Sequence, residues 1–63
     1  GHLSEREVLQ HIAVGESNHL IAEKLFISES TIKKHTNSIY EKIGVATRAQ
    51  TIAWAWRNGV VEE

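Results

Sequence analysis

The chain has 63 residues, no cysteine, no proline and four glycines. This length forms one small domain, and the lack of cysteine excludes a disulfide framework and a thiolate zinc site. The scarcity of helix-breaking residues favours helices. No apolar run approaches the roughly 20 residues that cross a bilayer, and no signal peptide is recognisable. We therefore expect an all-α domain that has no membrane partner and works in the cytoplasm.

The formal net charge of −1 argues weakly against a nucleic-acid partner, but the charge is unevenly distributed. Residues 1–23 contain one basic and four acidic side chains, whereas residues 24–57 contain six basic and two acidic ones. A locally positive face, rather than a positive total, is what releases counterions from a phosphate backbone. The charge distribution therefore indicates that a DNA-binding surface would lie within residues 24–57.

The first expected helix begins after Ser4, whose hydroxyl can cap it, and Glu7 can complete a capping box. The helix runs to about Val14, and Gly15 ends it as a glycine after the last turn commonly does. Its apolar residues recur at helical spacing and form the face toward the core. They are Val8, Leu9, Ile12 and Ala13.

Two further helices are expected at residues 18–25 and 29–42, with only residues 26–28 between them. Ser17 and Ser28 are suitable N-caps, because a hydroxyl accepts a hydrogen bond from an unpaired backbone N–H of the first turn. Helices joined this tightly cross steeply, which is the geometry of a helix-turn-helix. The residues of this unit expected in the core are Leu20 or Ile21, Ala22, Leu25, Phe26 and Ile27.

The second helix of this pair has a buried face and an outward face. At about 100° per residue, a buried stripe centred on Ile32 also contains Thr36, Ile39 and Ile43. The opposite face carries Ser30, Lys34, Asn37 and Glu41, with Lys33 and Ser38 on its flanks. A major groove admits such a helix, and lysine and asparagine read base edges there. Two adjacent lysines alone are more often solvated surface, and the tight helix-turn-helix spacing is what favours DNA.

A fourth helix is expected at residues 47–58, with Thr47 as its N-cap. A buried face centred on Ile52 places Trp56 in the core and directs Trp54 to solvent. Trp54 is then either an isolated exposed ring or part of a protein interface, where tryptophan and arginine are enriched. The interface interpretation includes its neighbours on that face, Gln50, Ala53 and Arg57.

Together these elements resemble the C-terminal DNA-binding domain of LuxR-type regulators, the family of LuxR, FixJ and NarL. The resemblance covers nearly the whole chain in the correct order without gaps. It implies a compact four-helix bundle over residues 3–61 that binds DNA as a dimer and regulates bacterial transcription. The matching residues are Glu7, Val8, Leu9, Ile12, Ala13, Gly15, Ser17, Asn18, Ile21, Ala22, Leu25, Ile27, Ser28, Thr31, Ile32, Lys33, His35, Ile39, Lys42, Ile43, Gly44, Val45, Arg48 and Gly59.

The resemblance also implies which residues touch DNA. Positions that reach bases in the major groove are matched by Lys33, Lys34 and Asn37, and Ser30 shares their outward face. Positions that hold phosphates are matched by Asn18, Thr31, Lys42 and Arg48, with Ser38 on the flank of the same helix. The fourth helix is the usual dimer surface, which here presents Gln50, Ala53, Trp54 and Arg57.

The chain departs from the family pattern at its start, where Leu-Thr-x-Arg-Glu is usual. Either Leu3 and Ser4 match Leu-Thr across a two-residue deletion, or, counting back from Gly15 without a gap, Ser4 stands where that arginine belongs. In the ungapped count, Gly1 and His2, which we interpret as the remnant of an expression tag, stand where Leu-Thr belongs. Thr51 replaces a usual alanine in the fourth helix, and residues 62–63 are expected to be a frayed tail.

A different class of function is a helical adaptor that binds a protein through the Trp54 face. Such an adaptor would bind independently of salt and would not need Lys34. An enzyme is disfavoured, because the four histidines and eight carboxylates do not converge on a pocket. The histidines also lack zinc-site spacing, so neither a cofactor nor a metal is expected.

The expected partners are double-stranded DNA and a second copy of the chain, with RNA polymerase as a further candidate. The resemblance also implies an N-terminal sensor domain that this chain does not contain. A phosphoreceiver, an autoinducer-binding domain and a large ATP-binding regulator all remain open for it. The operator sequence, and whether transcription is activated or repressed, do not follow from these residues.

Overall fold

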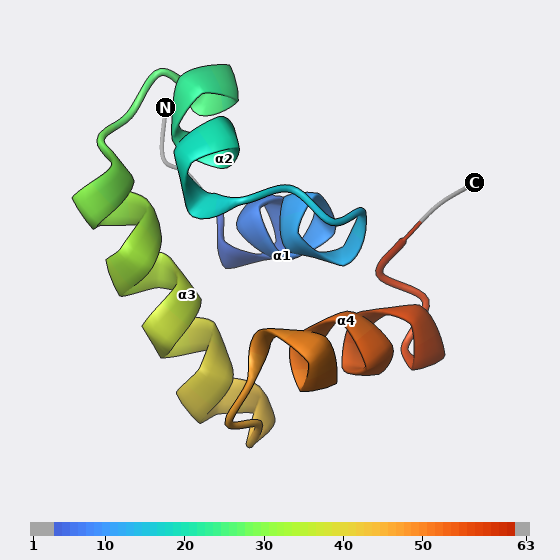
Figure 1. Ribbon diagram of the computed structural model, residues 1–63. Coiled ribbons are helices and arrows are strands. Elements are labelled where there is room, and N and C mark those ends of the chain that lie inside the picture. The colour runs from blue at the N-terminus through green and yellow to red at the C-terminus, as the bar shows by residue number, and fades with distance from the viewer. Residues whose placement is uncertain (1–3, 62–63) are drawn as a thin grey trace.

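The computed structural model describes residues 4–61, which form four helices joined by short loops (Figure 1). The helices are α1 (Glu5–Ala13), α2 (Asn18–Leu25), α3 (Glu29–Ile43) and α4 (Arg48–Arg57). No strand occurs within residues 4–61, so the predicted all-α four-helix fold is confirmed. None of the helices in this range is both long enough and apolar enough to span a membrane. The predicted tag remnant at Gly1 and His2 and the predicted frayed tail lie outside the described residues.

Every helix begins at a hydroxyl N-cap, as the sequence predicts. The side chains of Ser4, Ser17, Ser28 and Thr47 each accept the backbone N–H three residues further on. At α4 the cap is a full capping box, because the Gln50 side chain also accepts the Thr47 N–H. Such caps satisfy backbone donors that have no partner inside the helix. They fix where each helix starts, and the observed starts agree with the predicted ones.

The core gathers around α1, which packs against each of the other three helices. In Figure 1, α2 lies above α1, α4 lies below it, and α3 runs down the left side. The predicted stripe of α1 is buried, as is that of α3 except for the half-buried Ile43, and Val60 folds back from the end of α4 to join them. The buried apolar residues are Val8, Leu9, Ile12, Ala13, Ile21, Ala22, Ile32, Ile39, Ala55 and Val60. Burying one face of every helix is the main source of stability that so short a chain has available.

The prediction for the buried face of α4 was wrong. Thr51 and Ala55 are fully buried, Trp54 packs against the core, and Trp56 is 51% exposed. The centre of the face therefore lies between Thr51 and Ala55, about 80° around the helix from Ile52. Thr51 can occupy the centre because its hydroxyl donates to the Thr47 carbonyl at 2.9 Å, which leaves its methyl group for the core. The Trp56 indole instead donates to the Ala13 carbonyl at 3.2 Å.

The expectation that Phe26 packs into the core was also wrong, because its side chain is 94% exposed. Phe26 adopts a left-handed backbone conformation, with φ 59 and ψ 41, at the end of α2. The N–H of Ile27 then donates back to the Ala22 carbonyl at 3.1 Å, which is the bond of a Schellman motif. This reversal carries Ile27 against the core, as expected, and turns Phe26 outward. Of the alternatives at the start of α2, Ile21 is buried and Leu20 is exposed.

Candidate nucleic-acid interface

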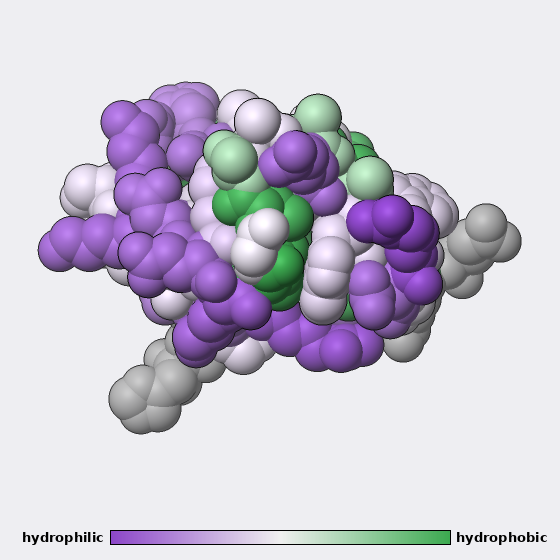
Figure 2. All heavy atoms as spheres, turned by 90° about the horizontal axis from the view of Figure 1, so that it is seen from below, coloured by the Kyte–Doolittle hydropathy of each residue, from purple (hydrophilic) through white to green (hydrophobic). Residues whose placement is uncertain are grey.

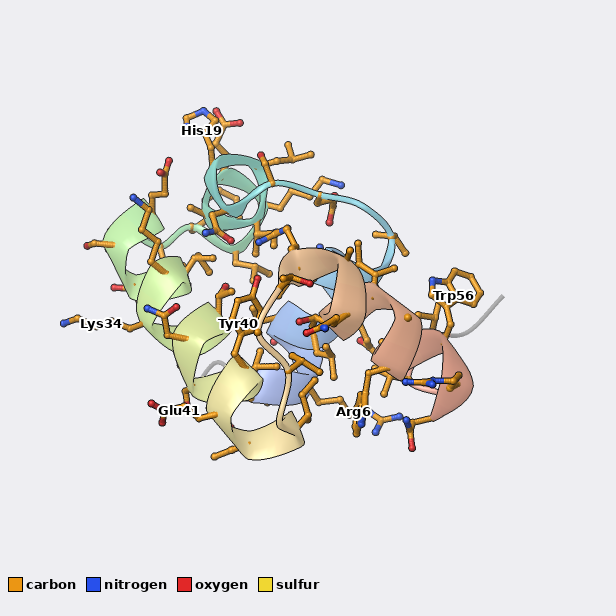
Figure 3. All side chains as sticks on the ribbon, turned by 60° about the horizontal axis from the view of Figure 1, so that its bottom comes forward. Arg6, His19, Lys34, Tyr40, Glu41 and Trp56 are labelled. Atoms are coloured by element: carbon orange, nitrogen blue, oxygen red, sulfur yellow. The ribbon has the colours of Figure 1, made fainter. Side chains whose placement is uncertain are left out.

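The outward face of α3 carries the residues predicted to contact bases. Ser30, Lys33, Lys34 and Asn37 are all exposed, and Figure 3 shows Lys34 extending away from the body of the domain. Lys33 is 3.9 Å from the Glu29 carboxylate, a weak pair one turn away on the same helix. Lys34 forms no ion pair with any residue of the described range 4–61. Lys34 is therefore the lysine whose charge is fully available to a phosphate or a base.

A second set of predicted contacts, Ser38 and Lys42, is already engaged within the domain. The Ser38 hydroxyl donates to one oxygen of the Glu5 carboxylate at 2.6 Å, and the Lys42 ammonium donates to the other at 2.5 Å. The bond from Lys42, followed by the one from Ser38, lowers the pKa of Glu5 below its ordinary value of 4.5. Glu5 is thus ionised at neutral pH and joins α1 to the C-terminal half of α3. Sequence reasoning missed it, because an acidic residue in a first helical turn is usually explained by the helix dipole.

Asn18 and Arg48, both predicted to hold phosphates, contact each other in the free domain. The Arg48 guanidinium donates to the Asn18 side-chain oxygen at 3.0 Å and to the Glu16 backbone carbonyl at 2.5 Å. The same Asn18 oxygen accepts the Thr36 hydroxyl at 3.3 Å. These three side chains connect the starts of α2 and α4 to the middle of α3. Thr31, the remaining predicted phosphate ligand, is half-buried, and its hydroxyl lies 2.8 Å from that of Ser28.

Part of the positive charge of residues 24–57 is compensated by acidic side chains from the N-terminal part of the chain. The Glu16 carboxylate pairs with Lys24 and with His11, on the side of the domain formed by α1 and α2. The contact with Lys24, followed by the one with His11, lowers the pKa of Glu16 from its ordinary value of 4.5. Lys24 and Lys42 are therefore neutralised by acidic partners. Of the four lysines in residues 24–57, Lys34 is the one without an ion pair to the described residues.

The α4 surface differs from the prediction in one respect. Gln50, Ala53 and Arg57 are exposed, but Trp54 is half-buried and forms part of the wall of a hollow of about 200 Å³. The adaptor hypothesis depended on a solvent-exposed Trp54, and the half-buried position of this side chain removes that support. Figure 2, a view onto the α4 side of the molecule, shows a strip of apolar surface between hydrophilic side chains. The apolar residues that line the hollow are Leu9, Ile39, Ile43, Trp54 and Val60.

A four-helix core that presents an exposed, cation-bearing second helix of a helix-turn-helix defines a small DNA-binding domain. Residues 3–55 match the family described as "Bacterial regulatory proteins, luxR family". The chain belongs to this family, whose members are DNA-binding transcriptional regulators and not enzymes. The resemblance inferred from the sequence is thereby confirmed.

Individual relatives agree with this assignment. Over 58 residues, the chain is 50% identical to the uncharacterized transcriptional regulatory protein YxjL of Bacillus subtilis and 45% identical to the probable transcriptional regulatory protein NarL of Mycobacterium tuberculosis. Each match covers 92% of this chain and 27% of the relative. The solved structure of the response regulator ChrA, from a heme-sensing two-component system, is similar with a TM-score of 0.82 at 44% identity, over 95% of this chain and 31% of that one. The chain thus spans about a quarter of the length of these curated relatives.

Proposed function

We propose that this domain binds double-stranded DNA sequence-specifically, with α3 in the major groove. The observation that carries the proposal is the outward stripe of α3, where Lys34 and Asn37 are exposed one turn apart. A lysine without an acidic partner retains its charge for guanine or phosphate, and an asparagine can form two hydrogen bonds with adenine. Lys33 and Ser30 flank this pair and complete the proposed base-contacting set.

Phosphate contacts would position α3 without reading sequence. We assign this role to Thr31, near the N-terminus of α3, and to Asn18 in the first turn of α2, where backbone N–H groups favour an anion. Arg48 contributes by fixing Asn18, because its guanidinium donates to the Asn18 side chain. Ser38 and Lys42 would reach a phosphate only in competition with Glu5, which holds both in the free domain.

We further propose that the domain dimerises on DNA through α4. Gln50, Ala53 and Arg57 follow one another at the spacing of one helix face and are exposed, and Trp54, next to Ala53 in the chain, is half-buried. A two-fold pair of domains would place two α3 helices on half-sites about one helical turn apart. The apolar strip visible on the α4 side in Figure 2 supports an interface there.

We infer that the complete protein is a bacterial response regulator that works in the cytoplasm, with a phosphoreceiver as its sensor domain. The similarity to ChrA, which is described as a response regulator, supports a receiver over an autoinducer-binding or ATP-binding domain. The relatives are regulators of transcription about four times as long as the matched segment. RNA polymerase is the partner through which such a protein would act on transcription.

The test measures binding of a fluorescent duplex of random sequence by anisotropy, at low and moderate salt. We compare the wild-type domain, Lys34→Ala and the control Arg6→Ala, which removes one exposed positive charge from α1, well away from Lys34 in Figure 3. Affinity should fall with salt at a log–log slope of about −0.9 per phosphate contact. Lys34→Ala should weaken binding, and Arg6→Ala should leave it nearly unchanged. No binding by the wild-type domain at low salt, or equal weakening by both variants, would refute the proposal.

A further inference from the structure

Glu5 stands out because one carboxylate of α1 holds two residues of the proposed DNA-reading helix. Its two oxygens accept from Ser38 at 2.6 Å and from Lys42 at 2.5 Å. Both partners are far away in sequence, at separations of 33 and 37 residues. The carboxyl side chain is 29% exposed and the Lys42 side chain 66% exposed, so DNA can approach the pair from the solvent side.

Lys34 and Lys42, which both belong to α3, are therefore not equivalent. Around the helix axis, Ser38 and Lys42 lie about 40° and 80° from Lys34. That flank is close enough to the outward face for a lysine side chain to reach a phosphate beside the groove. Lys34 has its full charge for this purpose, whereas the charge of Lys42 is compensated by Glu5.

We propose that Glu5 is a specificity-determining residue, which holds Lys42 and Ser38 and so withholds one positive charge from non-specific contact with DNA. This inference rests on the proposed binding of α3 in the major groove. Glu5 does not touch a base. It acts by occupying two side chains that would otherwise pair with any phosphate within reach.

The physical reason lies in the difference between loose and specific complexes. Non-specific binding is almost entirely electrostatic, so its affinity follows the number of free cations on the binding face. In a specific complex, contacts from Lys34 and Asn37 to base edges fix the position of α3, and a further phosphate contact adds less discrimination. Neutralising Lys42 therefore lowers the affinity for random DNA more than the affinity for a preferred site.

The first experiment uses Glu5→Gln, which removes the charge of the carboxylate but retains its shape and an oxygen that can accept hydrogen bonds. The matched control is Glu7→Gln, which removes the same charge from the same turn of α1 at an exposed position. For random duplex, Glu5→Gln should raise affinity several-fold at low salt and make the salt slope steeper by up to about 0.9. Glu7→Gln should change the slope much less. Equal slopes for the two variants would overturn the inference.

The same variants are then compared on a duplex selected from a random library by the wild-type domain, and on its scrambled counterpart. The ratio of the two affinities should fall for Glu5→Gln and hold for Glu7→Gln. A ratio that does not fall for Glu5→Gln would also overturn the inference. A library from which the wild-type domain enriches no sequence would instead overturn the proposed function.

A second variant tests the inference without altering Glu5, in case Glu5→Gln folds poorly. If Glu5 compensates Lys42, then Lys42→Gln should change the affinity for random duplex and its salt slope much less than Lys34→Ala does. In the Lys42→Gln background, adding Glu5→Gln should no longer steepen the slope. A salt slope that is shallower by about 0.9, one full phosphate contact, in Lys42→Gln would show that Lys42 is free to bind DNA and would contradict the role of Glu5. The Lys34→Ala variant tests the groove-binding proposal separately.

Discussion

Arg48 and Asn18 form a contact between the first turns of α4 and α2, with the guanidinium 3.0 Å from the asparagine side-chain oxygen. The same oxygen accepts from Thr36 of α3 at 3.3 Å, so a single atom connects three helices. Because Thr36 is 4% exposed, this contact is part of the packing beneath α3 and not of its outer face. The orientation of the proposed reading helix therefore depends on a polar contact that is itself partly inside the domain.

Replacing Arg48 tests this dependence. Arg48→Ala removes donors from the Asn18 oxygen and from the Glu16 carbonyl, and it should lower the free energy of unfolding by roughly 1–3 kcal/mol. In a domain of this size, each kcal/mol shifts the melting temperature by about 4–8 °C. The control is Arg57→Ala, an exposed arginine of the same helix, which should change stability by at most about 0.5 kcal/mol. Similar losses for the two variants in urea titrations would show that the Arg48 contacts contribute nothing specific.

Phe26 offers the opposite case, in which a substitution should stabilise the domain. Its left-handed backbone costs about 1–2 kcal/mol in a residue with a side chain, and its exposed ring recovers little of this by packing. Phe26→Gly should relieve that strain and raise the melting temperature, less a part lost to the greater freedom of glycine in the unfolded chain. The control is Val14→Gly, at an exposed helix end where φ is −88 and no strain exists to relieve. It should destabilise the domain, and a lower melting temperature for Phe26→Gly as well would contradict the prediction.

The pairing of Glu16 with Lys24 and His11 predicts a dependence of stability on pH. The pKa of Glu16 is lower in the folded domain than its ordinary value of 4.5, so the folded state binds this proton less readily than the unfolded chain does. Its contribution to stability is therefore complete above that value and is lost as pH falls through the lowered pKa. Thermal melts from neutral pH to acid should show wild type losing more stability than Glu16→Gln, with Glu7→Gln as a control that retains the pair. Parallel pH profiles for wild type and Glu16→Gln would exclude this contribution.

The proposed α4 interface predicts weak association of the isolated domain and stronger association on DNA. Sedimentation of the wild-type domain with a palindromic duplex should show two copies per duplex. Ala53→Glu places a like charge at the centre of the exposed face of both copies and should leave a single copy bound. Val14→Glu, an exposed position at the end of α1, is the control and should still give two. A stable monomer of the wild-type domain on a palindromic duplex would rule out dimerisation through this face.

Local sequence signals predicted the helices well because each boundary has a strong local cause. Hydroxyl caps start all four helices, and Gly44, in the left-handed conformation, ends α3 close to the predicted residue. The stripe of Ile32, Thr36 and Ile39 was predictable because one apolar face dominates α3. The face of α4 was not, because threonine and alanine form its centre while the largest apolar side chains lie to either side.

The outward residues of the candidate site were also predictable, since Lys34 and Asn37 face away from a well-defined buried stripe. The partners of the other site residues were not. Glu5 meets Lys42 only after the chain has folded, and the contact between Arg48 and Asn18 likewise depends on how α4 packs near α2. Phe26 misled the prediction because hydrophobicity alone does not reveal that its backbone turns left-handed.

Whether the outward face of α3 contacts DNA can be measured by NMR. Backbone amide shifts of the labelled domain are followed while duplex DNA selected by the domain is added. The largest changes should occur at Ser30, Lys33, Lys34 and Asn37, with smaller ones in the first turn of α2. In Lys34→Ala, the changes on α3 should require more DNA. Shifts concentrated on α1 and the end of α4, with α3 unaffected, would contradict the binding of DNA by α3.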